Sequence, residues 1–122
     1  MYDYKTLLEM WKKARFSKRA GYKAVKLDNN TYLSRNETGE FEIVLHSTAV
    51  VTVYPNNTYR LKTGGWYTVT TKDRINRFSP ARIFSRQGTW RMSNNELFQD
   101  GMIVDRHGKQ TRASRIEMGK VA

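Results

Sequence analysis

The sequence predicts an α+β domain with a strongly bent antiparallel sheet or small barrel, an N-terminal amphipathic helix and one short inserted helix. Three observations indicate this class. Apolar residues first repeat at helical spacing, and from about residue 23 they alternate with polar residues. Clusters of Asn, Asp, Gly and Pro separate the alternating runs, as in antiparallel hairpins. At 122 residues the chain is expected to form one domain, with its compact part over residues 1–105.

The first predicted element is a helix over residues 3–19. The apolar residues that repeat at helical spacing are Tyr4, Leu7, Leu8, Trp11 and Ala14. Asp3 is a suitable N-cap, and Gly21 would end the helix. The far side and tail of this helix carry five cations with no acid among them: Lys12, Lys13, Arg15, Lys18 and Arg19. Such a run is typical either of a surface that contacts phosphates or of a solvated face, and the pattern favours neither.

Strands are predicted over residues 23–70, with turns at 28–30, 36–39 and 55–57. These turns contain residues that tolerate left-handed or proline-fixed backbone angles. A sixth strand is expected at residues 66–70, after a two-glycine turn. Because each strand pairs with the next one along the chain, the pattern indicates a meander rather than a parallel sheet.

The fifth strand of this series places alternate side chains on opposite faces. Tyr59 and Leu61 would face the core, which leaves Arg60 and Lys62 on the outer face. Tyr67 could join these two cations. An aromatic ring beside cations can stack a base and pair its phosphate, although aromatic residues in small sheets more often pack in the core.

The two-glycine turn and two tryptophans are interpreted structurally. Gly64 and Gly65 would allow a left-handed turn or the close approach of another backbone. They do not form a phosphate-binding loop, because the sequence contains no GxxxxGK[ST] pattern. Trp66 and Trp90 are assigned to the core.

A short basic helix is predicted over residues 72–78, with Thr70 or Thr71 as its N-cap and Pro80 preventing its continuation. Lys72 would make its N-terminus cationic, so an anion could bind the free backbone amides there. The alternative is that threonine hydroxyls cap those amides within the fold.

The predicted helix has two distinct faces. Ile75 and Phe78 share the face that would pack on the sheet. Arg74 and Arg77 share another face, and we expect them to contact a ligand.

Further strands are predicted over residues 82–104. They comprise a hairpin around Gln87 and Gly88 and a short strand at 102–104. The remaining segment, residues 106–122, is basic and poor in large apolar side chains, so we expect a partly flexible tail.

The charge of the chain bears on its partner. Lysine and arginine total 22 against 11 aspartate and glutamate, which gives a net charge of +11. This charge concentrates polyanions, so nucleic acid is the expected partner. Binding would use mainly phosphates with weak sequence preference, because the cations are spread along the chain and no recognition-helix motif is evident. The candidate contacts for nucleic acid or an acidic partner are Lys12, Lys13, Arg15, Lys18, Arg19, Arg60, Lys62, Tyr67, Lys72, Arg74 and Arg77.

Residues 46–76, read with NNTYL at 29–33, resemble a family of small proteins found in tailed phages. The matching positions are Leu45, His46, Val50, Val51, Gly64, Gly65, Trp66, Thr70, Thr71, Lys72, Arg74, Ile75 and Asn76. The resemblance implies a viral origin and supplies no activity. It adds an alternative to nucleic-acid binding, in which a basic phage protein docks onto an acidic surface of a host protein or defence complex and blocks it. A virion or assembly component is a third hypothesis, and a basic surface without a polyanion target also stays open.

Several classes of function are disfavoured by the composition. The chain has no cysteine, which excludes disulfides, thiolate metal sites and cysteine nucleophiles. No secretory signal or membrane span is evident, so we expect a cytoplasmic protein without a membrane partner, a cofactor or a metal. We also expect no enzymatic activity. A metal-independent nuclease using His46 with a tyrosine or lysine is the remaining enzymatic alternative, although a lone histidine at a strand end more often hydrogen-bonds a turn.

Overall fold

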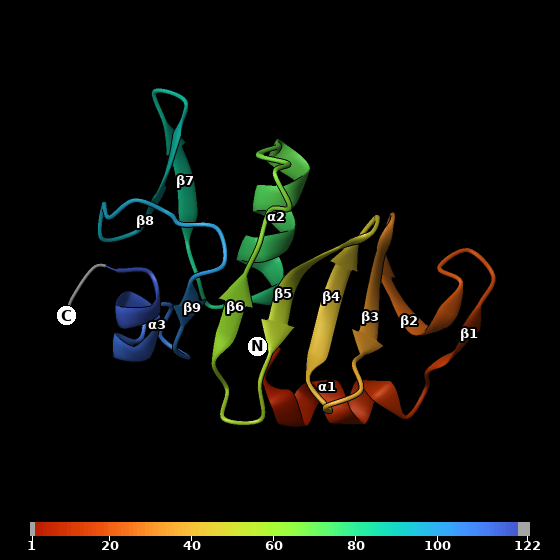
Figure 1. Cartoon of the computed structure of the whole chain (residues 1–122). Coiled ribbons are helices and arrows are strands. Elements are labelled where there is room, and N and C mark those ends of the chain that lie inside the picture. Colours follow the sequence, from red (N-terminus) through yellow and green to blue (C-terminus); the bar gives the residue numbers. More distant parts are fainter. Residues whose placement is uncertain (1, 120–122) are drawn as a thin grey trace.

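An antiparallel sheet spans the protein from β1 at one edge to β9 at the other (Figure 1). The computed structural model describes residues 2–119. Within these residues the sheet has the strand order β1-β2-β3-β4-β5-β6-β9, and β7 and β8 form a separate hairpin. The strands are β1 (Arg15–Ser17), β2 (Tyr22–Asp28), β3 (Thr31–Arg35), β4 (Phe41–Leu45), β5 (Thr48–Val53), β6 (Tyr59–Leu61), β7 (Ile83–Arg86), β8 (Thr89–Met92) and β9 (Ile103–Val104). The helices are α1 (Tyr4–Trp11), α2 (Val69–Phe78) and α3 (Arg112–Glu117).

This architecture confirms the predicted α+β class, with an open antiparallel sheet rather than a closed barrel. Strands β1 to β5 each pair with the next strand along the chain, which confirms the meander through β6. The turns predicted at 28–30 and 55–57 contain Asn30 (φ 51°) and Asn57 (φ 63°), both left-handed. Asparagine tolerates this conformation better than most residues, so the local sequence determines where these hairpins turn.

One face of the sheet forms the core together with α1 and α2. Its fully buried side chains are Leu33, Phe41, Ile43, Val51, Val53, Tyr59 and Leu61, which the strand register places side by side. Leu7 of α1 and Ile75 and Phe78 of α2 are buried against them. The predicted inward orientation of Tyr59 and Leu61 is therefore confirmed, as is the packing face of α2.

The helix predicted over residues 3–19 ends at Trp11, although Asp3 is its N-cap as predicted. Beyond Trp11 the sequence offers little apolar surface with which to continue a helical face, whereas pairing with β2 satisfies the backbone groups of β1. Gly21 does not end a helix. It lies in the β1–β2 hairpin with φ 85°, and its N–H donates to the carbonyl oxygen of Ser17 at 2.7 Å.

The strand predicted at residues 66–70 does not form. The free edge of β6 is occupied by β9 instead. Helix α2 begins before the predicted residues 72–78, because Thr68 rather than Thr70 or Thr71 is the N-cap: its Oγ1 accepts the N–H of Thr71 at 3.1 Å. The early cap converts the predicted strand into a loop and the first turn of a helix.

The C-terminal part contains the predicted hairpin, the predicted short strand and one helix that was not predicted. The β7–β8 hairpin turns at Gln87 (φ 53°) and Gly88 (φ 78°), and β9 lies within the short strand expected at 102–104. In place of a loose tail after residue 105, α3 packs beside β9, and the buried Ser114 Oγ accepts the N–H of Ile103 at 2.9 Å. The last residues of the predicted tail, 120–122, lie outside the described residues.

Gly108→Ala is expected to destabilise the fold by about 2–3 kcal/mol. Gly108 has φ 80°, and a Cβ built there would lie 2.5 Å from the carbonyl oxygen of Pro80. Gly88 has a similar φ of 78° but open space around it, so Gly88→Ala should cost only about 1 kcal/mol. Urea unfolding of both variants measures the difference. Equal losses would show that the contact with Pro80 relaxes without cost.

Candidate nucleic-acid interface and adjoining pocket

Residues 12–26 form the most basic surface segment of the described chain, and we call them the basic ribbon. They comprise the end of the α1 turn, β1, the hairpin and most of β2. Their cations are Lys12, Lys13, Arg15, Lys18, Arg19, Lys23 and Lys26, and no acid lies among them. In the described residues, the ion pair formed by this group is Lys12 with Glu9, at 3.1 Å on the exposed side of the helix. The five predicted contacts at 12–19 therefore lie on one edge of the sheet, although not on one helix.

An exposed aromatic side chain lies within the basic ribbon. Phe16 is 69% exposed and pairs across the hairpin with Lys23. The Nζ of Lys23 lies 5.3 Å from the ring centre of Trp11, which holds this cation beside the aromatic side chains. Phe16 was not among the predicted contacts. The signal available in the sequence was its position between Arg15 and Lys18, which becomes informative once residues 15–17 are known to be a strand.

The arginines of α2 are brought together as predicted but are engaged by carboxylates. Arg77 contacts Asp28 and Asp73, and Arg74 contacts the same two residues. Arg74 Nε also donates to Thr31 Oγ1 at 2.8 Å. These contacts fasten α2 to the end of β2. They offset part of the positive charge that the sequence placed on this helix face.

Asp28→Asn is expected to lower stability at neutral pH and to lower it progressively less in acid. The hydrogen bond from Arg77, aided by the N–H of Asn29, lowers the pKa of Asp28 below its ordinary value of 3.8. A depressed folded-state pKa contributes stability above the unfolded value, and this is lost as pH falls through the folded value. The gap between wild type and variant should therefore be constant above about pH 5 and shrink below about pH 4. Urea midpoints across pH measure it, with Glu37→Gln as a control that removes a charge from an exposed turn. A gap that persists unchanged in acid would contradict the assignment.

Arg60 is on the outer face of β6 as predicted, but its guanidinium group is used within the fold. Its Nη1 donates to the carbonyl oxygen of Gly101 at 2.9 Å and to Glu117 at 3.0 Å, and its Nε donates to the Tyr54 hydroxyl at 3.0 Å. The bond from Arg60 lowers the pKa of Glu117. Arg60 thus fastens α3 to the sheet, whereas Lys62 beside it is exposed.

The two aromatic residues before α2 have different environments. Tyr67 packs edge-on against Trp90, with ring centres 5.0 Å apart, and also contacts Phe98. It therefore joins the β7–β8 hairpin rather than the cations of β6. Trp66, assigned to the core from its size, is 66% exposed, whereas Trp90 is 8% exposed and confirms its assignment.

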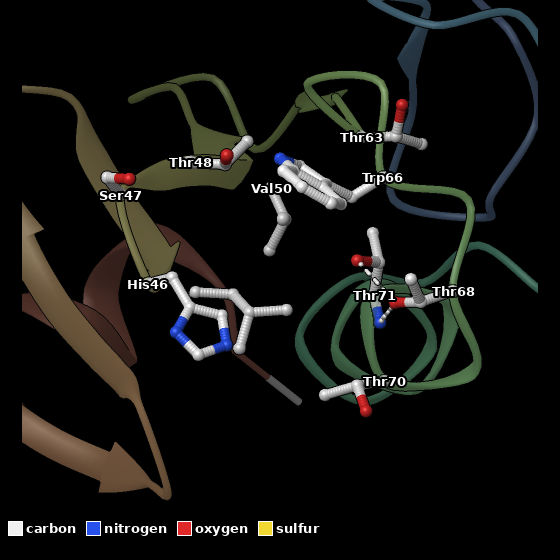
Figure 2. A pocket seen from close by; sticks show the side chains of 10 residues that line it. His46, Ser47, Thr48, Val50, Thr63, Trp66, Thr68, Thr70 and Thr71 are labelled. Atoms are coloured by element: carbon white, nitrogen blue, oxygen red, sulfur yellow. Dashed lines mark hydrogen bonds between the residues drawn. The ribbon is translucent and has the colours of Figure 1, made fainter.

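A pocket of about 450 Å³ lies between the β4–β5 turn and the start of α2 (Figure 2). Its lining residues are Leu45, His46, Ser47, Thr48, Val50, Thr63, Trp66, Thr68, Thr70 and Thr71. Figure 2 shows the Trp66 indole next to Val50, the Thr70 and Thr71 side chains on the α2 side of the pocket, and His46 on the opposite side. Many residues that carry the phage-family resemblance therefore meet in one place, although they are far apart in the sequence.

The loop that forms one wall of the pocket is fixed by polar contacts. Asp100 accepts the N–H of Thr63 at 2.7 Å and its hydroxyl at 2.9 Å, and Thr63 Oγ1 accepts the N–H of Gly65 at 3.0 Å. Gly64 has φ 62°, and a Cβ there would lie 2.9 Å from the side chain of Thr48. With Gly65 at φ 90°, both glycines are left-handed, so the left-handed turn is the predicted alternative that is observed, and the close neighbour of Gly64 is a side chain rather than another backbone.

His46 lines the pocket without an evident catalytic partner. It is exposed in the β4–β5 turn with φ 56°, and its backbone N–H donates to the carbonyl oxygen of Asn30 at 2.8 Å. Among the described lining residues there is no tyrosine, lysine or carboxylate to act with it. Across residues 2–119, no cluster of three or more His, Cys, Asp or Glu side chains could hold a metal ion. In the same residues no helix has the length and apolar character needed to cross a bilayer.

A family model described as Kyanoviridae Gp96 protein matches residues 9–105. The chain belongs to this phage protein family. The Gp96 match confirms the expectation of a phage protein, and it includes the basic ribbon and the pocket while leaving α3 outside. No curated protein and no solved structure matches this Gp96 family member.

Proposed function

We propose that this phage protein binds nucleic acid through phosphate contacts of the basic ribbon, with weak sequence preference. The observation that carries the proposal is the run of seven cations without an acid in residues 12–26, with Phe16 exposed among them. Lysine and arginine release condensed counterions when they contact phosphates, and this release drives sequence-independent binding. An exposed phenyl ring adds a surface on which a base of any sequence can stack.

The place of the ribbon in the fold supports the proposal. β1 is an edge strand, and the hairpin lies at one end of the sheet (Figure 1). A two-stranded ribbon is narrow enough to lie along a nucleic-acid groove or strand. Cations also protect edge strands from pairing with other chains, but one or two lysines serve that purpose. Seven cations and an exposed phenylalanine are more than the protection of an edge strand requires.

Helix α2 is expected to contribute less to nucleic-acid binding than the basic ribbon does. Arg74 and Arg77 share Asp28 and Asp73, so a phosphate would have to compete with two carboxylates already in place. Lys72 of the first turn and Lys62 of the preceding segment form no ion pair among the described residues, and they remain secondary candidates.

Fluorescence anisotropy with single- and double-stranded DNA and RNA across a salt series tests the proposal. We expect micromolar or tighter binding at low salt, with the logarithm of the association constant falling linearly with the logarithm of salt concentration. Little difference between sequences of equal length is expected. Absence of binding to all four nucleic acids at low salt would refute the proposal.

A second candidate function has a specific observation in its favour. Trp66, Tyr67 and Val69 are large apolar residues that are exposed in one short segment. Exposed apolar residues near cations are typical of protein interfaces, and they favour docking onto an acidic host protein. If nucleic acid does not bind, affinity capture from host lysate, with and without Trp66→Ser, becomes the deciding experiment.

A further inference from the structure

We propose that the pocket between the β4–β5 turn and α2 receives one unpaired nucleobase, which stacks on the indole of Trp66. This inference rests on the proposed nucleic-acid binding and specifies it further: the preferred substrate would contain single-stranded nucleotides. Double-stranded nucleic acid holds its bases in the stack and could contact the basic ribbon alone.

The size and chemistry of the pocket fit a neutral, planar, hydrogen-bonding ring. Its volume of about 450 Å³ is within the range of small-ligand sites. Leu45, Val50 and Trp66 supply apolar walls, while threonine and serine hydroxyls supply donors and acceptors. None of the described lining residues is Asp, Glu, Lys or Arg. The pocket therefore suits an uncharged group, because a charged one would find no oppositely charged partner among these side chains.

The Trp66 side chain is 66% exposed and follows a loop that is held in place. The loop before it is fixed by Asp100 through Thr63, and Gly64 brings the backbone against Thr48. Trp66 makes none of the aromatic ring contacts found among residues 2–119, in contrast to its neighbour Tyr67. A preformed loop that presents an exposed indole reduces the ordering cost of stacking a base.

A cation beside the pocket would meet the anionic backbone that a base carries with it. Lys72 directly follows the lining residue Thr71 at the start of α2. Lys62 directly precedes the lining residue Thr63, but its side chain is exposed on the outer face of the sheet together with Arg60. The pocket therefore combines a neutral interior with a cation next to its α2 wall, which suits an uncharged base joined to a phosphate.

The pocket and the basic ribbon are joined by β2. This strand runs from the ribbon to the β2–β3 turn, where the carbonyl oxygen of Asn30 accepts the N–H of His46. The length of β2 corresponds to roughly 20 Å, a distance that a few single-stranded nucleotides span. One strand could thus place phosphates on the ribbon and a base in the pocket.

Oligonucleotides that contain 2-aminopurine test the inference, because the fluorescence of this base falls when it stacks. Single-stranded probes of about 12 nucleotides would be titrated with wild-type protein, Trp66→Leu and Tyr67→Leu. We expect a several-fold fluorescence decrease with wild type and Tyr67→Leu, its loss in Trp66→Leu, and an affinity about tenfold weaker for that variant. Tyr67→Leu is the matched control because its ring faces Trp90.

The outcomes separate this inference from the proposed function. Equal affinity and equal fluorescence decrease for Trp66→Leu would overturn the inference while leaving ribbon binding intact. If wild type binds no oligonucleotide, the proposed function fails, and adenosine and uridine are then added while the indole N–H signals are followed by NMR. A saturable shift of the Trp66 signal would support a base pocket on its own, and no shift would overturn it. This second measurement uses wild-type protein, so it decides the matter even if Trp66→Leu does not fold.

Discussion

Replacing Lys13, Arg15, Lys18 and Arg19 together with glutamine is expected to weaken nucleic-acid binding about 100- to 1000-fold near 0.1 M salt. All four side chains are exposed, and they form no ion pair among the described residues. Each lost phosphate contact should reduce the salt slope by about 0.9 for duplex DNA and about 0.7 for single strands. Anisotropy titrations of wild type and variant across the salt series would therefore differ in slope by about 3–4.

The matched control removes the same charge from the other end of the sequence. Its four substitutions, also to glutamine, are at Arg86, Arg106, Lys109 and Arg112, all exposed. The net charge falls from +11 to +7 in both variants, because each loses four of the 22 cations. A local interface predicts a large effect for the ribbon variant and a loss of about tenfold or less for the control. Similar losses in both variants would indicate that overall charge, and not the ribbon, determines binding.

Phe41→Ala is expected to destabilise the protein by about 3–5 kcal/mol. The Phe41 side chain is 0% exposed at the first position of β4. Its ring centre lies 5.1 Å from that of Tyr4 and 6.0 Å from that of Trp11, so it joins α1 to the sheet. Truncation would leave a cavity beneath the helix, and a loss of this size is a large fraction of the stability of a typical domain.

Phe16→Ala is the matched control for this prediction. The same truncation at a side chain that is 69% exposed removes little buried surface, so we expect a change within about 0.5 kcal/mol. Chemical denaturation with urea measures both variants. A comparable loss for Phe16→Ala would mean that its ring packs against the fold, which would weaken the case for Phe16 as a base-stacking residue.

The sequence allowed the meander to be predicted because its signals are local. Alternation of apolar residues and the left-handed preference of Asn30 and Asn57 act within a few positions. Strand β1 could not be predicted from such local signals. Residues 12–19 become partly a strand because β2 has a free edge beside them, and that edge is a property of the folded sheet. Likewise, β9 takes the place beside β6 that residues 66–70 were expected to fill.

In the candidate site, too, features with local signals were predictable and features that depend on distant residues were not. The run of cations at 12–19 could be read directly from the sequence. The engagement of Arg74 and Arg77 by Asp28 could not, because the partners are more than 40 positions apart. The exposure of Trp66 was also hidden, since a large apolar residue is by default assigned to the core. Its position depends on the contact of Thr63 with Asp100, which is again remote in sequence.

The pairing of β6 with β9 has a consequence for the order in which the chain acquires its structure during synthesis. Strands β1 to β6 need only neighbours that have already been made, so the meander can assemble as the chain is produced. The open edge of β6 has to wait about 40 residues, until Ile103 is available to pair with Arg60. During that interval the nascent protein exposes the unpaired backbone groups of the β6 edge, and unpaired strand edges promote aggregation. Residues near 103 therefore complete a sheet that the first half of the chain has begun.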